Sequence, residues 1–305
     1  MDADHSRLSW SVQRRLRFIE LRLYWEGRIN RAALMEFFGI SQPQASQDIA
    51  RYNEVAPGNL AYDKVAKTYV AGADFKPAFG DISADAYLAQ LRSIETGGLA
   101  AGESWIGRAP AFAGPPRLRR HYDPDLLRQL IRCIHGRLQL ATSYLSFSDE
   151  APSVRTIAPH ALGFDGQRWH VRAFCLRTSS FRDFVIGRLS QVDEPVRTSV
   201  SPEWDLEWTE QVTLKLGVNP ELSAPMRQAI ERDYLMRQGR LNVTTSICSS
   251  YYLESQLNLD IQTSDLPPKR LQLVLLNRPE VLARRAEVQE AAAALIAQAS
   301  QNLVN

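Results

Sequence analysis

The sequence predicts an α+β chain of several domains, with a helical N-terminal domain, a small antiparallel β-barrel in the middle and an α/β domain at the C-terminus. Helical spacing of apolar residues fills 7–56, strand alternation with turn signals fills 138–199, and a strand–helix–strand pattern begins at Val212. A length of 305 residues suits two or three cores better than one. We therefore expect domains at 1–75, 121–199 and 200–305, with a helical or irregular linker at 76–120.

Composition places the chain among globular proteins of a reducing compartment. Charged residues make up 23% and hydrophobic residues 45%, which is ordinary for this class. The N-terminus lacks the apolar core of a signal peptide, and no apolar run approaches the ~18 residues that span a bilayer. The three cysteines, Cys133, Cys175 and Cys248, are odd in number and far apart, which argues against disulfides and a cysteine zinc site. We expect a cytoplasmic protein without a membrane partner.

Positive charge is concentrated in the middle of the chain. Residues 117–199 contain 13 arginines, no lysine and 8 acidic residues, a local charge of +5, whereas the whole chain carries +2. Arginine offers a fixed fork of donors that suits phosphate and other planar anions. This bias indicates an anion-binding region, although a coding preference for arginine would produce the same composition.

The first 56 residues predict three helices with a sharp turn between the second and the third. Apolar residues from Leu8 to Leu23 recur at helical spacing, and a second helix is expected over about 31–38, with Leu34, Phe37 and Phe38 buried. Gly39 suits the left-handed turn that follows. Ser41 and Gln44 form an S-x-x-Q capping box that begins a third helix. Its inward positions are Ala45, Ile49 and Tyr52.

The outward face of this third helix is composed of amides and hydroxyls instead of the usual lysine and glutamate. A helix-turn-helix places such a face in the major groove, where glutamine pairs with adenine, arginine with guanine and serine with either. Two β-prone runs follow, and they predict a wing that contacts backbone phosphate. A plain three-helix packing unit with a polar surface is the alternative. The predicted DNA-contacting residues are Ser41, Gln42, Gln44, Ser46, Gln47, Arg51, Lys64 and Lys67.

Strand alternation in the middle segment predicts a small barrel of the SH3 or Sm type. One face of the first strand is expected to carry Leu138, Leu140, Thr142 and Tyr144. The next alternating run places Trp169, Val171, Ala173 and Cys175 on one side and His170, Arg172 and Phe174 on the other. A third run places Arg182, Phe184, Ile186 and Arg188 together.

This segment resembles the WYL-domain transcriptional regulators. The resemblance is carried by Tyr144, Arg155, Pro159, Leu162, the triplet Trp169-His170-Val171, and the run Arg182-x-Phe184-x-x-x-Arg188-Leu189. The naming triplet is Trp-His-Val here instead of Trp-Tyr-Leu. The resemblance implies a barrel that senses a small anionic nucleotide or a nucleic-acid effector. The lining that it implies is Tyr144, Ser146, His160, Arg172, Arg182 and Arg188.

The order of domains is most similar to the subset of these regulators linked to anti-phage defence, of the BrxR and CapW kind. That similarity implies homodimeric repressors that control defence operons, including their own, and a C-terminal domain that helps to form the dimer. The last helix, expected over about 280–302, has an apolar stripe that packs either on its own domain or on a partner chain. Its members are Val281, Leu282, Ala286, Val288, Ala292, Leu295 and Ile296.

No catalytic or cofactor motif is found in the sequence. A Walker loop, a G-x-G-x-x-G after a strand and an H-E-x-x-H helix are absent, and the histidines are not spaced as a metal pair. We therefore expect no enzyme, no cofactor and no metal. The predicted function is a homodimeric regulator that binds double-stranded DNA at an inverted repeat. The alternative is a module for RNA or single strands that uses the arginine-rich barrel.

Overall fold

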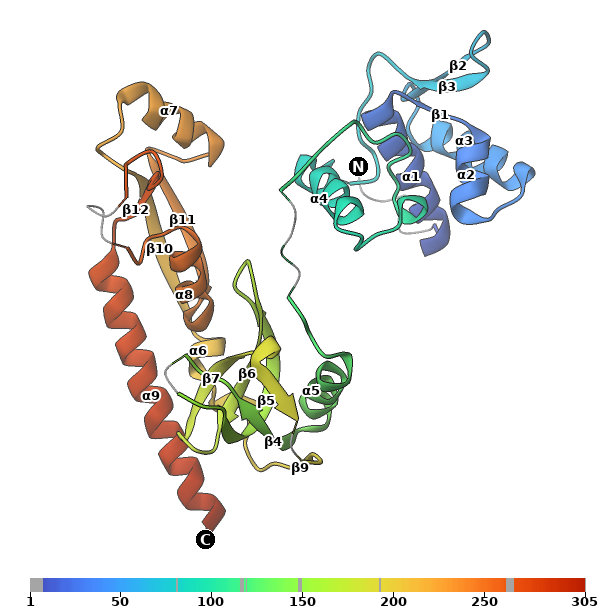
Figure 1. Ribbon diagram of the computed structural model, residues 1–305. Helices are drawn as coiled ribbons and strands as arrows, with labels where there is room; N and C mark the ends of the chain where they lie inside the picture. Colours follow the sequence, from blue (N-terminus) through green and yellow to red (C-terminus); the bar gives the residue numbers. More distant parts are fainter. Residues whose placement is uncertain are drawn as a thin grey trace. The chain divides into compact units, whose positions relative to one another are not determined.

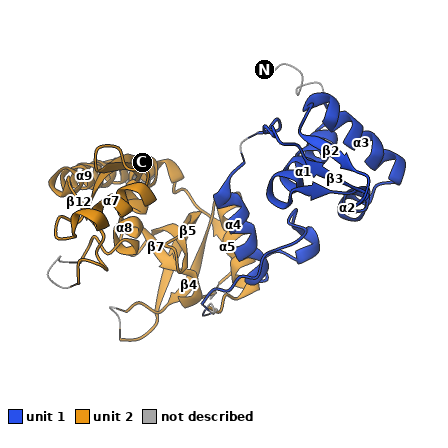
Figure 2. Cartoon of the chain, turned by 90° about the horizontal axis from the view of Figure 1, so that it is seen from above, with its two compact units in different colours: residues 1–118 blue, residues 119–305 orange. Residues whose placement is uncertain are grey.

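The computed structural model describes residues 8–80, 82–115, 118, 120–147, 150–191, 193–261 and 266–304. The chain divides into two compact units, with the boundary after Leu118 (Figure 2). Each unit has its own hydrophobic core. No helix within the described ranges is both long and apolar enough to cross a membrane.

The first unit is a winged helix-turn-helix, as predicted (Figure 1). Its three helices are followed by the hairpin β2–β3, and strand β1, between α1 and α2, completes an antiparallel wing sheet in the order β1-β3-β2. The expected linker region contains one further helix and a 3-10 turn over 101–103. The elements are α1 (Trp10–Glu26), β1 (Arg28–Ile29), α2 (Arg31–Phe38), α3 (Gln42–Val55), β2 (Leu60–Asp63), β3 (Thr68–Ala71) and α4 (Ala84–Glu95).

The turn between α2 and α3 forms as the sequence predicts, except for half of the capping box. Gly39 has φ +63°, and its N–H caps α2 on the carbonyl of Met35, a conformation that side chains beyond glycine resist. Ser41 Oγ accepts from the Gln44 N–H at 3.4 Å. The Gln44 side chain does not reach back to Ser41 but donates to Asp48 Oδ1 at 3.2 Å. The reciprocal bond of the capping box is therefore replaced by a contact one turn further on.

The core of the first unit joins the three helices and the chain that follows the wing. Phe37 and Phe38 are half-buried instead of fully buried, because both rings pack at the edge of the core on Phe18. Glu20, which is 2% exposed, accepts hydrogen bonds from Tyr52 and from the N–H groups of residues 78 and 79. This buried carboxylate therefore fixes the segment after the wing against α1. The fully buried members of the core include Leu16, Ile19, Leu23, Leu34, Ala45 and Tyr52.

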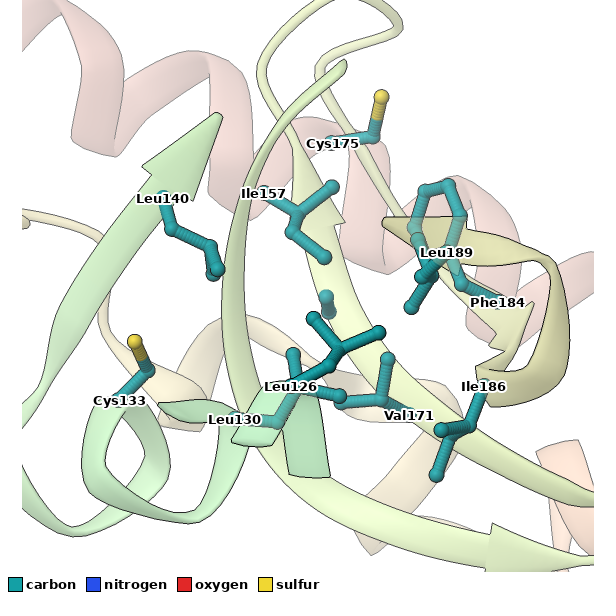
Figure 3. Packing of buried hydrophobic residues seen from close by; sticks show 11 residues of the cluster. Leu126, Leu130, Cys133, Leu140, Ile157, Val171, Cys175, Phe184, Ile186 and Leu189 are labelled. Carbon is teal, nitrogen blue, oxygen red and sulfur yellow. The ribbon is translucent and has the colours of Figure 1, made fainter. Parts of the chain in front are cut away.

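The second unit begins with a helix and the antiparallel strands that were predicted to form a small barrel. The strand order is β7-β6-β5-β4-β8, and β9 also pairs with β4. Helix α5 contributes Leu126, Leu130 and Cys133 to the core on one face of this sheet (Figure 3). The elements are α5 (Pro124–Gly136), β4 (Leu138–Tyr144), β5 (Ser153–Phe164), β6 (Trp169–Cys175), β7 (Ser180–Val185), β8 (Leu189–Gln191) and β9 (Val196–Arg197).

Strand β6 is buried on both faces. Val171, Ala173 and Cys175, which were predicted to share one side of the strand, lie in the core, whereas Trp169 is 45% exposed at the start of the strand. The opposite positions His170, Arg172 and Phe174 are also buried, because C-terminal segments cover that side of the sheet. The third predicted run alternates only as far as Val185, since residues 186–188 form a 3-10 turn.

The C-terminal part has the predicted strand–helix–strand order, with a sheet β11-β10-β12 in which all pairs are antiparallel. The short helix α6 connects the two sheets and contacts α8 and α9. The remaining elements are α6 (Leu206–Thr209), β10 (Gln211–Val218), α7 (Ala224–Asp233), β11 (Arg240–Ser246), α8 (Ile247–Gln256), β12 (Leu273–Leu275) and α9 (Arg278–Val304).

The buried face of α9 differs from the predicted stripe. Val281 and Val288 are buried, but Leu282 is 52% exposed and Ala286 is exposed. Arg285 takes an inward position, where it contacts Glu254 at 2.5 Å and the hydroxyl of Ser250 at 2.6 Å. A buried ion pair thus occupies part of the face that the apolar stripe predicts.

Candidate nucleic-acid interface and effector groove

The first half of α3 presents a polar surface, as a recognition helix requires. Ser41, Gln42 and Gln47 are exposed, whereas Ser46 and Arg51 are half-buried. Ser46 Oγ also accepts from Arg31 Nη1 at 3.5 Å. Gln44 is half-buried and is held by Asp48. Gln42 and Gln47 are consequently the amides with the most freedom to contact a base edge.

An ion pair that the sequence analysis missed holds α3 against α1. Arg15 Nε lies 2.7 Å from Asp48 Oδ2, and Arg15 Nη2 lies 3.1 Å from Asp48 Oδ1. Their side chains are 12% and 2% exposed, so this fork is largely desolvated. One signal could have found it: Asp48 falls at core spacing between Ala45 and Ile49, where a carboxylate requires a partner.

The two predicted wing lysines lie in the turn between β2 and β3. Lys64 and Lys67 are exposed, and Lys67 has φ +51°. The turn is ordered by Asp63 Oδ1, which accepts from the N–H groups of Val65 and Ala66 at 2.8 and 3.0 Å. Both cations therefore lie exposed in the turn of an ordered hairpin.

The second unit contains a groove of about 800 Å³ between the edge strand β7 and helix α9. Four of the six residues implied by the family resemblance line it: Tyr144, Ser146, Arg172 and Arg182. The sequence analysis did not assign its other residues to a ligand site, and they include two further arginines and one side of α9. These are Arg155, Arg177, Thr178, Ser179, Ser180, Phe181, Asp183, Phe184, Asp205, Glu207, Gln289, Ala292, Ala293 and Ile296.

The other two predicted residues, His160 and Arg188, do not line this groove. His160 Nε2 lies 2.8 Å from Asp205 Oδ2, so His160 stands behind a carboxylate that lines the groove. The Arg188 guanidinium stacks 3.6 Å from the ring centroid of Phe147, which is 84% exposed. His160 therefore contacts the groove indirectly, through Asp205 and through the ring of Phe181, whose centroid is 5.4 Å from that of His160.

Arg172 lies at the base of the groove and is shared among three carboxylates. Its Nε and Nη2 form a fork with Asp205 at 2.7 and 2.8 Å, Nη2 also donates to Glu207 at 2.8 Å, and Nη1 donates to Asp183 at 3.3 Å. Burial acts to lower the pKa of Arg172, but these hydrogen bonds and charges outweigh burial and raise it. Burial likewise acts to raise the pKa of Asp205, and the bonds from Arg172 and His160 lower it. Arg172 thus remains protonated, and its positive charge is already balanced by the surrounding carboxylates.

Two other arginines of the groove have capacity for an incoming anion. Arg182 Nε donates to the hydroxyls of Thr178 and Ser180 at 3.1 and 3.3 Å. Arg177 is exposed. Within the described ranges neither guanidinium forms an ion pair with a carboxylate. They are therefore available to bind a phosphate-like group.

His170, the departure from the family triplet, packs between the sheet and α8. Its ring stacks on Tyr252 with centroids 5.3 Å apart and an interplanar angle of 15°. Burial lowers the pKa of His170, although Asp165, whose carboxylate is 3.7 Å away, acts in the opposite direction. Burial therefore disfavours the protonated imidazole. Among the described residues, no group of three or more His, Cys, Asp or Glu is arranged to hold a metal ion.

Family models match all three parts of the chain. The winged helix-turn-helix domain of the BrxR transcriptional regulator matches residues 11–93, the WYL domain matches 125–194, and the BrxR C-terminal dimerization domain matches 211–281. These boundaries follow the winged helix, the first sheet and the second sheet.

The similarity to curated relatives extends over nearly the whole chain. The DNA-binding transcriptional repressor CapW of Escherichia coli is 37% identical over 274 residues, 90% of this chain and 92% of that protein. The CapW proteins of Stenotrophomonas maltophilia and Pseudomonas aeruginosa are 37% and 36% identical over 90% and 89% of this chain, and over 93% and 91% of their own lengths. The chain belongs to the BrxR and CapW family of WYL-domain transcriptional regulators, a family of regulators and not of enzymes.

Proposed function

We propose that this chain is a cytoplasmic, homodimeric transcriptional repressor that binds an inverted repeat in double-stranded DNA. The observation that supports this most strongly is the polar face of α3, whose exposed Gln42 and Gln47 stand on a helix fixed by a desolvated ion pair. Two copies of α3 would enter successive major grooves, about 34 Å apart or a multiple of that distance. Lys64 and Lys67 would hold the wings on phosphate.

The groove of the second unit supports a sensor for an anionic effector. Arg177 and Arg182 supply cationic forks, Tyr144 supplies an aromatic edge, and a row of hydroxyls supplies donors. These groups suit a nucleotide or a short nucleic acid. An effector bound there would favour one arrangement of the dimer and release DNA, to the extent that its affinity differs between the two arrangements.

The regulated operon is proposed to be the chain's own, within an anti-phage defence locus. A gel shift with the DNA upstream of its own gene tests this, with a scrambled duplex and a single strand of equal length as competitors at fixed salt. A discrete complex that survives the scrambled competitor supports the proposal. Preference for the single strand would instead transfer the function to the arginine-rich groove.

The base-contacting face is tested with Gln47→Ala, and Asn53→Ala at an exposed position near the end of α3 is the matched control. A good bidentate base contact is worth ~1–3 kcal/mol of discrimination, so Gln47→Ala should reduce the preference for the operator at least fivefold while non-specific affinity stays the same. An unchanged preference would show that this face of α3 does not contact bases.

A further inference from the structure

We infer that Arg172 exchanges partners when the groove is occupied: an anionic group takes the Nη1–Nη2 edge of its guanidinium from Glu207 and Asp183, and the release of Glu207 loosens the contact between the groove and α9. This inference rests on the effector groove proposed above. It adds the route by which occupancy of that groove reaches the C-terminal dimerization domain.

The donors of Arg172 are nearly all in use. A guanidinium has five N–H donors, and four hydrogen bonds are present, two to Asp205, one to Glu207 and one to Asp183. A bidentate anion needs two parallel donors on one edge. It can therefore bind Arg172 only by displacing a carboxylate.

The two edges of the guanidinium differ in how firmly they are held. Asp205 occupies the Nε–Nη2 edge with both oxygens, is 1% exposed and is also bonded to His160. Glu207 and Asp183 share the Nη1–Nη2 edge through one contact each, and their side chains are 18% and 24% exposed. Partly hydrated single contacts are weaker than a buried fork. The Nη1–Nη2 edge is thus the exchangeable one.

The negative charge around Arg172 also requires that an incoming anion displace a carboxylate instead of binding beside all three. Three carboxylates already surround one guanidinium, and His160 supplies at most one further positive charge. A fourth anion beside this guanidinium would be repelled by the other three. When Glu207 leaves the guanidinium, the loss of its negative charge offsets the negative charge of the incoming anion. Arg177 and Arg182 would hold the rest of the ligand at the same groove.

Glu207 connects this exchange to the C-terminal helices. It lies on α6, and its Oε1 accepts from Gln289 Nε2 of α9 at 2.9 Å. Gln289 Nε2 is also 3.1 Å from the hydroxyl of Tyr251 on α8. In Figure 1 the long red helix α9 runs beside the sheet and past α6. Release of Glu207 from Arg172 would therefore free the hydrogen bond that holds the middle of α9 to the groove.

The test is hydrogen–deuterium exchange of the full-length protein, titrated with inorganic phosphate at constant ionic strength and measured in the segment 289–296. Phosphate should speed exchange in this segment of the wild-type protein. Glu207→Gln should speed it without phosphate, because a neutral amide is a poorer partner for Arg172. The same variant should lower the midpoint of the phosphate titration about tenfold, since a charged hydrogen bond no longer competes.

Two control variants distinguish partner exchange at Arg172 from a general effect of surface charge or of phosphate. Glu203→Gln removes the same charge from an exposed position of the same connection outside the groove, and it should leave both measurements unchanged. Arg182→Ala should raise the phosphate midpoint. A phosphate midpoint that rises in Arg182→Ala but is identical in the wild type and Glu207→Gln would show that the groove binds the anion while Arg172 only holds α6 in place. No effect of phosphate on any variant would overturn the groove itself. This experiment contains no DNA, so its outcome does not depend on operator binding. A failed gel shift and a failed hydrogen–deuterium exchange test are therefore distinguishable results.

Discussion

Replacement of Asp48 by alanine should destabilise the winged helix-turn-helix and disorder its recognition surface. Asp48→Ala removes two hydrogen bonds with Arg15 and one with Gln44. Loss of one partner of a buried ion pair costs ~3–5 kcal/mol. We take about 3 kcal/mol, at the lower end of that range, because the Arg15 side chain is 12% exposed and can reach water.

Hydrogen exchange is the appropriate assay because the chain has two units and need not unfold in one step. A loss of about 3 kcal/mol corresponds to roughly 100-fold faster exchange of the protected α3 amides. Exchange in 120–304 should not change. Glu36→Ala, which removes an exposed carboxylate from α2, is the control and should have little effect. Replacing both partners by apolar residues, as Arg15→Met with Asp48→Leu, should recover most of the loss.

The reasoning would be refuted by exchange less than fivefold faster in Asp48→Ala, or by a double variant no better than the single one. Either result would mean that apolar packing alone orients α3. In the expected case, operator binding by Asp48→Ala should weaken even though Asp48 is buried. Its effect would arise from the position of α3.

Two further predictions concern the wing and the interior of the second unit. Lys64→Ala should weaken binding to all duplexes alike and lower the slope of log affinity against log salt by ~0.9, as measured by fluorescence anisotropy at several salt concentrations; a change confined to the operator would contradict a phosphate contact. Because burial lowers the folded-state pKa of His170, its stabilising contribution is present above about pH 6.5, the unfolded value, and is lost as the pH falls through the folded pKa. Melting of the second unit should therefore shift to lower temperature between pH 7 and pH 5, and His170→Phe, which keeps the stacking on Tyr252, should reduce that shift; an equal shift in both proteins would mean that other groups titrate.

The sequence was sufficient for the elements whose formation depends on neighbouring residues. The bounds of α2, the turn at Gly39, the wing strands β2 and β3 and the order of the two sheets follow from periodicity, turn chemistry and capping, all of which act over a few residues. The inward positions Ala45, Ile49 and Tyr52 were likewise predicted from helical spacing. The family was predicted from residues at fixed positions in the strands of the first sheet.

The ion pairs of the candidate sites depend instead on contacts between residues that are far apart in the sequence. The partner of Asp48 is 33 positions away, and the partners of Arg172 at 205 and 207 lie on a short helix that periodicity does not pair with β6. Alternation assigns a residue to one side of a strand but does not say what covers that side. For this reason the sequence placed Arg172 as a ligand contact, while the fold surrounds it with three carboxylates. The sequence by itself thus determined the local elements, their order and the family, and the tertiary structure decided which charges of the candidate sites are already paired.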